Sequence, residues 1–206
     1  AWLAAREPDA PAVVFEGTTR TRRELESRSN RLARSYEQAG VREGDRITIA
    51  LPNSLEFFEV CLAAWKLGAS PNPVSSRLPE MERRELVDLA DPALVSGVPE
   101  GIYEKRISRP AGFEPAATIP DTPLPDVVSQ VARTLASGGS TGRPKLIVTR
   151  EPALTDPELE TNRARYAGCT LVPGPLYHAG PFMASWQAIL AGSRVILMPR
   201  FDAEES

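Results

Sequence analysis

The sequence has few of the residues that build metal centres or disulfide frameworks. Its 206 residues include two cysteines, Cys61 and Cys169, and one histidine, His178. The two cysteines lie far apart and form no CxxC pair, which argues against both a zinc site and a disulfide framework. Such cysteine usage favours a reducing, cytoplasmic setting.

A strong net charge and long apolar runs are absent as well. The formal net charge of −3 gives no electrostatic reason to expect a nucleic acid or an anionic membrane as partner. No apolar run approaches the roughly 20 residues that a membrane-spanning helix requires. A content of 42% hydrophobic and 25% charged residues is typical of a globular domain, so we expect a soluble protein.

The two ends of the sequence resemble cuts through a longer polypeptide. The chain opens on Ala1 without a methionine, and residues 201–206 resemble the first turn of a helix that continues. A length of 206 residues suits either one domain or part of a larger one. We expect the second.

Apolar spacing predicts alternating helices and strands over residues 1–97. The first helix is expected to begin with a capping box of Thr21 and Glu24 and to end at Gly40. Its arginines alternate with glutamates, which predicts a solvated face. Helices are expected at 21–40, 54–68 and 79–89, and strands at 45–52 and 92–97. This alternation indicates an α/β fold, with a mainly parallel sheet between covering helices.

The pattern changes twice after this segment. Residues 98–126 carry prolines at 99, 110, 115, 120, 123 and 125, which predicts an extended connection over the surface. Residues 127–206 return to order, with an extended run at 127–136, strands at 145–148, 169–176 and 194–198, and a helix at 181–191. The chain thus divides into three segments, 1–97, 98–126 and 127–206.

Residues 137–145, SGGSTGRPK, form a loop of unusual composition between two of these strands. Its glycines allow successive backbone N–H groups to turn to one side, and its hydroxyls and lysine add further donors. This composition is typical of a polyphosphate-binding loop, although residue types alone also fit a mobile surface hairpin. The donors are Ser137, Gly138, Gly139, Ser140, Thr141, Gly142 and Lys145.

The loop differs from the common nucleotide-binding patterns. A Walker loop has lysine directly after its last glycine and then opens a helix, whereas Gly142 is followed by Arg143, Pro144 and Lys145 and then by a strand. No glycine spacing here fits the dinucleotide fingerprint at a strand-to-helix turn.

SGGSTGRPK instead resembles the phosphate-binding loop of the adenylate-forming enzymes, the superfamily of acyl-CoA synthetases, peptide-synthetase adenylation domains and luciferases. The stretch from TRREL to SSRLP is similar to the opening part of that family. GPLYHAGPF falls at the family's aromatic/His motif beside the carboxylate pocket, and LAGSRVILMPRFDAEE is similar to the stretch beyond it. The resemblance covers nearly the whole chain and implies parallel-rich sheet layers flanked by helices, in an incomplete N-terminal AMP-binding domain.

Two positions depart from the family pattern. Gly138 stands where serine is common, and Leu146 stands where a glycine follows the lysine. The first change removes a hydroxyl, and the second stiffens the exit of the loop. Together with PLYHAGPF, this variant most resembles a branch of bacterial acyl-CoA ligases that includes bile-acid-type enzymes.

The resemblance implies an acid–thiol ligase. Such enzymes join a carboxylic acid to AMP from ATP with Mg²⁺, release pyrophosphate and pass the acyl group to coenzyme A. By this resemblance, the hydroxyls of Ser140 and Thr141 and the backbone of Gly139 and Gly142 would hold the departing pyrophosphate. Lys145 would either contact phosphate or anchor the loop, and both roles stay open.

The aromatic/His motif is expected to serve the acyl group. His178 would orient the substrate carboxylate and line the way in for the thiol of coenzyme A, with Tyr177 beside it. Gly180 and Phe182 are expected to shape the acyl pocket. For Phe182, core packing together with Trp186 explains the helical spacing equally well.

Two other functions remain open at this stage. One is an adenylation domain that loads a carrier protein, and the other is a non-adenylating relative that acts as a binding or thioesterifying module, which Gly138 and Leu146 favour. The family's acidic motif, ribose-binding aspartate, hinge and C-terminal lysine are expected beyond Ser206. The 206-residue chain is therefore expected to need a missing C-terminal half for turnover. The sequence does not identify the carboxylic acid or the oligomeric state.

Overall fold

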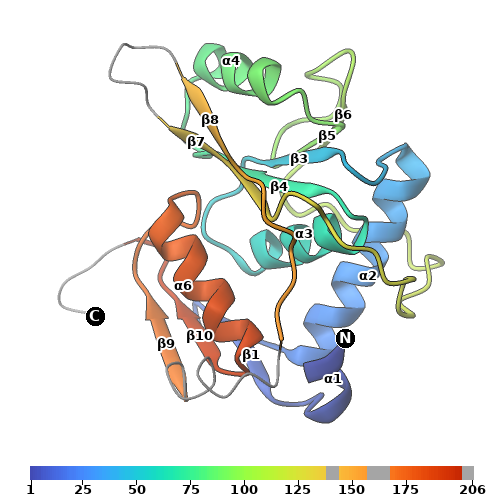
Figure 1. Ribbon diagram of the computed structural model, residues 1–206, viewed down its shortest axis with the longest axis vertical. Coiled ribbons are helices and arrows are strands. Elements are labelled where there is room, and N and C mark those ends of the chain that lie inside the picture. Colours follow the sequence, from blue (N-terminus) through green and yellow to red (C-terminus); the bar gives the residue numbers. More distant parts are fainter. Residues whose placement is uncertain (138–143, 157–167, 201–206) are drawn as a thin grey trace.

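The computed structural model describes residues 1–137, 144–156 and 168–200. Within them lie two four-stranded sheets, a two-stranded hairpin and five helices (Figure 1). The first sheet has the order β2-β1-β10-β9, and the second has the order β4-β3-β5-β6. The helices are α1 (Trp2–Arg6), α2 (Arg22–Ala39), α3 (Leu55–Lys66), α4 (Glu80–Ala90) and α6 (Ala179–Leu190).

Parallel pairing dominates both sheets, as the alternation of helices and strands predicts. In the first sheet β1 pairs parallel with β10 and β10 with β9, while β2 forms an antiparallel hairpin with β1. In the second sheet every pair is parallel. The strands are β1 (Pro11–Phe15), β2 (Thr18–Thr21), β3 (Arg46–Ile49), β4 (Ser70–Pro73), β5 (Leu94–Ser96), β6 (Ile107–Arg109), β7 (Arg133–Ser137), β8 (Lys145–Thr149), β9 (Cys169–Val172) and β10 (Arg194–Leu197).

The predicted helix ends are confirmed by their caps. The Thr21 hydroxyl accepts from the backbone N–H of Glu24 at 3.2 Å, while the Thr21 N–H donates to the Glu24 carboxylate at 2.8 Å. Gly40 ends α2 with a φ of 116°, a backbone conformation that favours glycine. The Ser54 hydroxyl accepts from the Phe57 N–H at 3.2 Å and begins α3.

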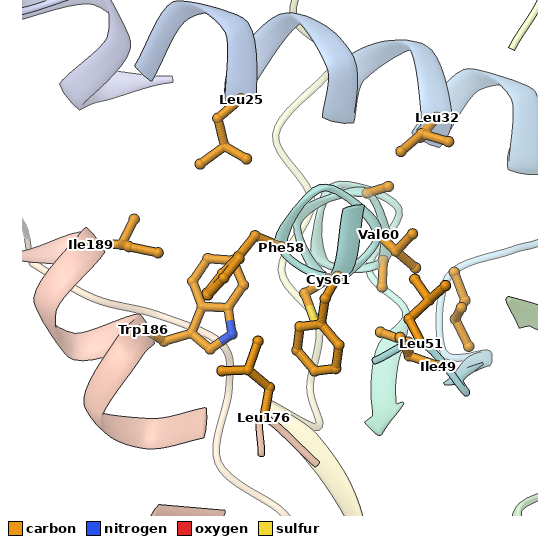
Figure 2. Packing of buried hydrophobic residues seen from close by; sticks show 14 of the residues in the cluster. Leu25, Leu32, Ile49, Leu51, Phe58, Val60, Cys61, Leu176, Trp186 and Ile189 are labelled. Atoms are coloured by element: carbon orange, nitrogen blue, oxygen red, sulfur yellow. The ribbon is translucent and has the colours of Figure 1, made fainter. Parts of the chain in front are cut away.

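The main hydrophobic core surrounds α3, which packs against α2 and against strands of both sheets. In Figure 2 the Phe58 side chain of α3 lies beside the Trp186 indole of α6, and their ring centroids are 5.3 Å apart. On the second sheet, Ile47, Ile49 and Leu94 belong to the same core. A smaller cluster that includes Val87 of α4 and Val95 of β5 covers the other face of this sheet.

The sequence analysis did not predict strands β1, β2, β4 and β6, whose sequences are short or contain proline. Strand β4 reads SPNP and lies at the edge of its sheet, where a proline without an N–H group is tolerated. Strand β6, inside the proline-rich connection, has three residues and pairs with β5 at the opposite edge. The expected start of a helix at 201–206 lies outside the described residues.

The prediction of a solvated arginine face on α2 is confirmed only in part, since Arg23 is exposed while other arginines contact the proline-rich connection. Arg28 donates to Glu114 at 2.6 Å, and Arg34 donates to the carbonyl oxygens of Pro120, Thr122 and Pro123 at 2.9 to 3.2 Å. Both sets of acceptors belong to the proline-rich connection, 98–126. Helical spacing identifies a polar face but not the distant segment that covers it, so the long-range contacts were missed.

The Asp121 carboxylate of the connection contacts two side chains of α2. The Ser27 hydroxyl donates to Asp121 at 2.7 Å, and the Arg31 guanidinium lies 3.4 Å from the same carboxylate. The hydrogen bond from Ser27 and the charge of Arg31 lower the pKa of Asp121. The proline-rich connection is thus attached along α2 by charged and backbone groups.

Candidate active site

The two ends of the glycine-rich loop are described, and they pair with each other. β7 and β8 form an antiparallel ladder in which Ser137 lies opposite Lys145 and Ala136 opposite Leu146. The prediction that the loop joins two strands is confirmed. Leu146 continues β8 as its second residue, so the departure from glycine fits a regular strand. The predicted phosphate ligands Gly138, Gly139, Ser140, Thr141 and Gly142 lie outside the described residues.

Buried polar side chains fix this hairpin against the second sheet. The Thr48 hydroxyl donates to the Asn72 side-chain oxygen at 2.9 Å, and the Asn72 amide donates to the Thr134 carbonyl of β7 at 3.0 Å. All three residues are buried. Since a buried polar group is costly to leave unpaired, this set of bonds specifies where β7 lies, and with it the base of the loop.

The aromatic/His motif lies in the turn between β9 and α6. His178 is the residue before α6, its N–H donates to the Pro175 carbonyl at 3.1 Å, and its carbonyl accepts from the Phe182 N–H at 3.1 Å. The side chain is exposed, and the ring centroid of Tyr177 lies 4.2 Å from that of His178. The expected position of His178, after a strand and before a helix, is confirmed.

A cavity of about 400 Å³ joins the loop to this motif. Ser137 and Pro144, at the two flanks of the loop, line it together with Tyr177 and His178. Its apolar part comes from residues that follow β4, from α4 and from β7. These include Val74, Leu86 and Ala136.

Two carboxylates from α4, those of Glu82 and Glu85, also line the cavity. They form no ion pair with any residue that the structure describes. Sequence reasoning assigned α4 no role in the site. Its polar residues fit an ordinary exposed helix face, and nothing in the spacing indicates that two of them face the loop.

Two of the predicted acyl-pocket residues lie away from this cavity. The Phe182 ring is 2% exposed and packs against Phe57 and Trp65, with ring centroids 6.3 Å apart in each pair. Gly180 lies in the first turn of α6, is exposed and does not line the cavity. Phe182 is thus a core residue, and it also lines a separate cavity of about 420 Å³ together with Trp65 and Met183.

Lys145 begins β8 with an exposed side chain. Its ammonium group makes no hydrogen bond or ion pair with any residue in the described ranges, while its backbone belongs to the β7–β8 ladder. A free ammonium group beside the loop suits a phosphate ligand, because a lysine acts as a compact positive charge. An anchoring role for Lys145 would require a partner outside the described residues.

Metal ligands and cysteine thiols are two further kinds of candidate group among the described residues. The described residues contain no group of three or more His, Cys, Asp or Glu side chains arranged to hold a metal ion. Burial raises the pKa of the Cys61 thiol well above its usual value, so Cys61 is unsuited to act as a nucleophile.

Within the part of the chain that the structure describes, no helix is long and apolar enough to cross a membrane. The described residues form an α/β domain in which Ser137 and Pro144, the flanks of the glycine-rich segment, line one cavity together with the aromatic/His turn.

Comparison with known proteins identifies the class. The profile of the AMP-binding enzyme family matches residues 1–206, so the chain belongs to this family of adenylate-forming enzymes.

Individual relatives agree with this assignment. The chain is 34% identical to the feruloyl-CoA synthase of an Amycolatopsis species over 97% of its own length, and it spans 43% of that enzyme. It is 28% identical to the fatty acid–[acyl-carrier-protein] ligase ScoC of Streptomyces coeruleorubidus, across 98% of the chain and 43% of that protein.

Solved structures share the fold. The N-terminal domain of FACL13 from Mycobacterium tuberculosis, at 21% identity, matches 99% of the chain and 57% of its own, with a TM-score of 0.74. The o-succinylbenzoate CoA synthetase MenE from Bacillus subtilis, at 20% identity, matches 99% of the chain and 44% of its own, with a TM-score of 0.80. The predicted α/β fold of an adenylate-forming N-terminal domain is confirmed.

Proposed function

We propose that this chain is the N-terminal AMP-binding part of an acyl-CoA ligase. The observation that carries the proposal is the cavity of about 400 Å³, since the loop flanks Ser137 and Pro144 share it with Tyr177 and His178. Joining a carboxylate to a nucleotide requires a phosphate site and a carboxylate site next to each other. The two motifs are about 40 positions apart in the sequence and meet only in the fold.

In this proposal residues 137–145 hold the phosphates of ATP, and His178 with Tyr177 orients the carboxylate. Negative charge gathers on the departing pyrophosphate, so preorganised N–H and O–H donors and Lys145 lower the barrier. Bound Mg²⁺ would neutralise part of the same charge. The proposed domain is incomplete, with its α/β segment at 1–97, the proline-rich connection at 98–126 and the site at 127–206.

Coenzyme A is the proposed acceptor of the acyl group. The similarity to the feruloyl-CoA synthase supports it. Loading of a carrier protein is a second candidate, supported by the similarity to ScoC over 98% of the chain. Leu146 lends the non-adenylating alternative little support, because β8 accommodates this residue as an ordinary strand position.

The test of adenylation is ATP–pyrophosphate exchange by the longer protein that contains this chain, with a panel of aromatic, alicyclic and aliphatic carboxylic acids. We expect exchange that depends on one class of acid and on Mg²⁺. The same acid is then offered with coenzyme A or with a phosphopantetheinylated carrier protein. Thioester formation on coenzyme A supports the proposal. If the thioester forms only on the carrier protein, the carrier protein is the acceptor instead of coenzyme A. Absence of exchange with every acid overturns the proposed adenylation.

The carboxylates of Glu82 and Glu85 lead to a prediction about the acceptor. When the neutral thiol arm of coenzyme A enters the cavity, its negatively charged phosphate groups come near the carboxylates of Glu82 and Glu85 and are repelled by them. Replacing both residues by glutamine is expected to lower the KM for coenzyme A about threefold to tenfold at low salt, because two repulsive charges are removed. The difference from the unchanged protein should shrink as salt is added.

Glu80→Gln is the matched control for this double variant. Glu80 lies on the same helix but pairs with Arg84 at 2.8 Å and does not line the cavity. Its replacement is expected to leave the KM for coenzyme A within about twofold, because an exposed pair contributes little. An unchanged KM in the Glu82→Gln, Glu85→Gln protein would show that the acceptor does not enter past α4.

A further inference from the structure

Asn53 connects the two sheets at the edge where the candidate site lies. It follows β3 of the second sheet and directly precedes Ser54, the cap of α3. Its side-chain amide reaches the first sheet and donates to the carbonyl of Gly174 at 3.1 Å and to that of Met198 at 2.8 Å. These two carbonyls lie just beyond the ends of β9 and β10.

The oxygen of the same amide is used as well. It accepts from the backbone N–H of Leu176 at 2.9 Å, two residues before His178. Both donors and the acceptor of Asn53 are therefore paired with backbone groups more than 100 positions away in the sequence. A side chain with every group engaged by rigid backbone has one preferred position and imposes it on its partners.

The turn that Asn53 holds is fixed from other sides too. The Leu176 side chain is 1% exposed and points into the core beside Trp186 (Figure 2). A Cβ atom at Gly174 would lie 2.7 Å from Cγ of Pro181, so this position accepts only glycine while Pro181 stays in place. The Asn53 amide adds the hydrogen bonds that these apolar contacts do not supply.

We infer that Asn53 is a positioning residue that fixes the turn at 174–178 and thereby the placement of the His178 imidazole in the cavity. Asn53 does not line the cavity itself, so its effect passes through the turn. The consequence for catalysis rests on the proposed function, in which His178 orients the carboxylate. The placement of the ring is a property of the free protein and can be measured without any ligand.

The chain offers a direct probe, because His178 is its only histidine. Once any histidine tag is removed, the ring Cε1–H group gives one cross-peak in a carbon–proton spectrum of the labelled chain. In Asn53→Ala all three hydrogen bonds are lost, and we expect this peak to shift and to broaden or split as the turn samples several positions. Asn53→Asp keeps an acceptor for Leu176 but sets a carboxylate against two carbonyl oxygens, and an intermediate change is expected.

Asn30→Ala is the matched control. Asn30 is a buried asparagine that donates to the Asp121 carbonyl at 2.8 Å, and it lies on α2 away from the turn. It is expected to lower the melting temperature without moving the His178 peak. A peak that is unchanged in folded Asn53→Ala, or one that moves equally in Asn30→Ala, would falsify the inference. If Asn53→Ala does not fold, Asn53→Asp is judged by the same two criteria.

Activity provides a second measurement in the longer protein. A misplacement of about 1 Å costs on the order of a hundredfold, so Asn53→Ala is expected to lower kcat/KM for the carboxylic acid by up to that factor. The KM for ATP should change far less, because the base of the phosphate loop is held by Asn72 and Thr134 instead. Absence of exchange in the unchanged protein would overturn the proposed function, whereas the His178 spectrum would still decide the role of Asn53.

Discussion

Replacing Glu59 with alanine is expected to lower the free energy of unfolding by about 3 kcal/mol, because it removes a buried carboxylate that two partly buried guanidinium groups share. The Glu59 side chain on α3 is 1% exposed. It accepts from Nε of Arg28 at 2.8 Å and lies 3.0 Å from Nε of Arg20. Urea denaturation of the two proteins at pH 7 measures the difference.

Glu114 supplies the control, since it binds the same arginine from the surface. Its carboxylate lies 2.6 Å from Nη2 of Arg28, but its side chain is 64% exposed. Glu114→Ala is expected to lower the free energy of unfolding by less than about 1 kcal/mol, because exposed ion pairs contribute little to stability. The double variant Glu59→Ala, Arg28→Ala should recover part of the loss from Glu59→Ala. Equal losses in the two single variants would show that burial does not set the strength of this network.

The second large effect is expected at Lys145. Replacing it with alanine removes a charge that has no partner among the described residues, and it should weaken binding of ATP and of pyrophosphate with Mg²⁺. The adenylation rate of the longer protein should fall on the order of a hundredfold, as on loss of one preorganised donor to a developing charge. Calorimetry on both proteins, with Thr141→Ala as a second variant, measures the binding.

Two further variants sharpen this test. Lys105→Ala removes the same charge from an exposed position in the proline-rich connection and is expected to leave binding unchanged. Lys145→Arg keeps the charge and should retain most of the affinity if Lys145 contacts phosphate. If the unchanged protein and Lys145→Ala bind ATP and pyrophosphate equally well, Lys145 does not contact phosphate and has at most an anchoring role.

Local signals in the sequence predicted the elements well because they act over a few residues. The capping box of Thr21 and Glu24, the cap at Ser54 and the glycine at 40 each set a helix end through neighbouring backbone groups. The strands on both sides of the glycine-rich loop follow from short apolar runs in the same way.

Long-range contacts were not predictable in this manner. Asn53 occupies a proline-containing turn that looks like an ordinary helix start, yet its partners lie more than 100 positions away. The arginines of α2 have helical spacing that fits solvent as well as it fits a bound segment. The spacing of Phe182 fits both a pocket and the core, and its packing against Phe57 and Trp65 is a long-range contact that the spacing does not specify.

The attachment of the proline-rich connection to α2 has a consequence for how the length of this protein can vary. Glu114 is held by Arg28, and residues 120–123 are held by Arg34, whereas residues 116–118 between them are exposed. Extra residues inserted at 116–118 would lengthen a short loop whose two ends are bound to Arg28 and Arg34 of α2. Each doubling of loop length lowers the free energy of unfolding by only about 0.6 kcal/mol. A peptide tag or a fluorescent reporter placed at 116–118 should therefore leave the domain folded.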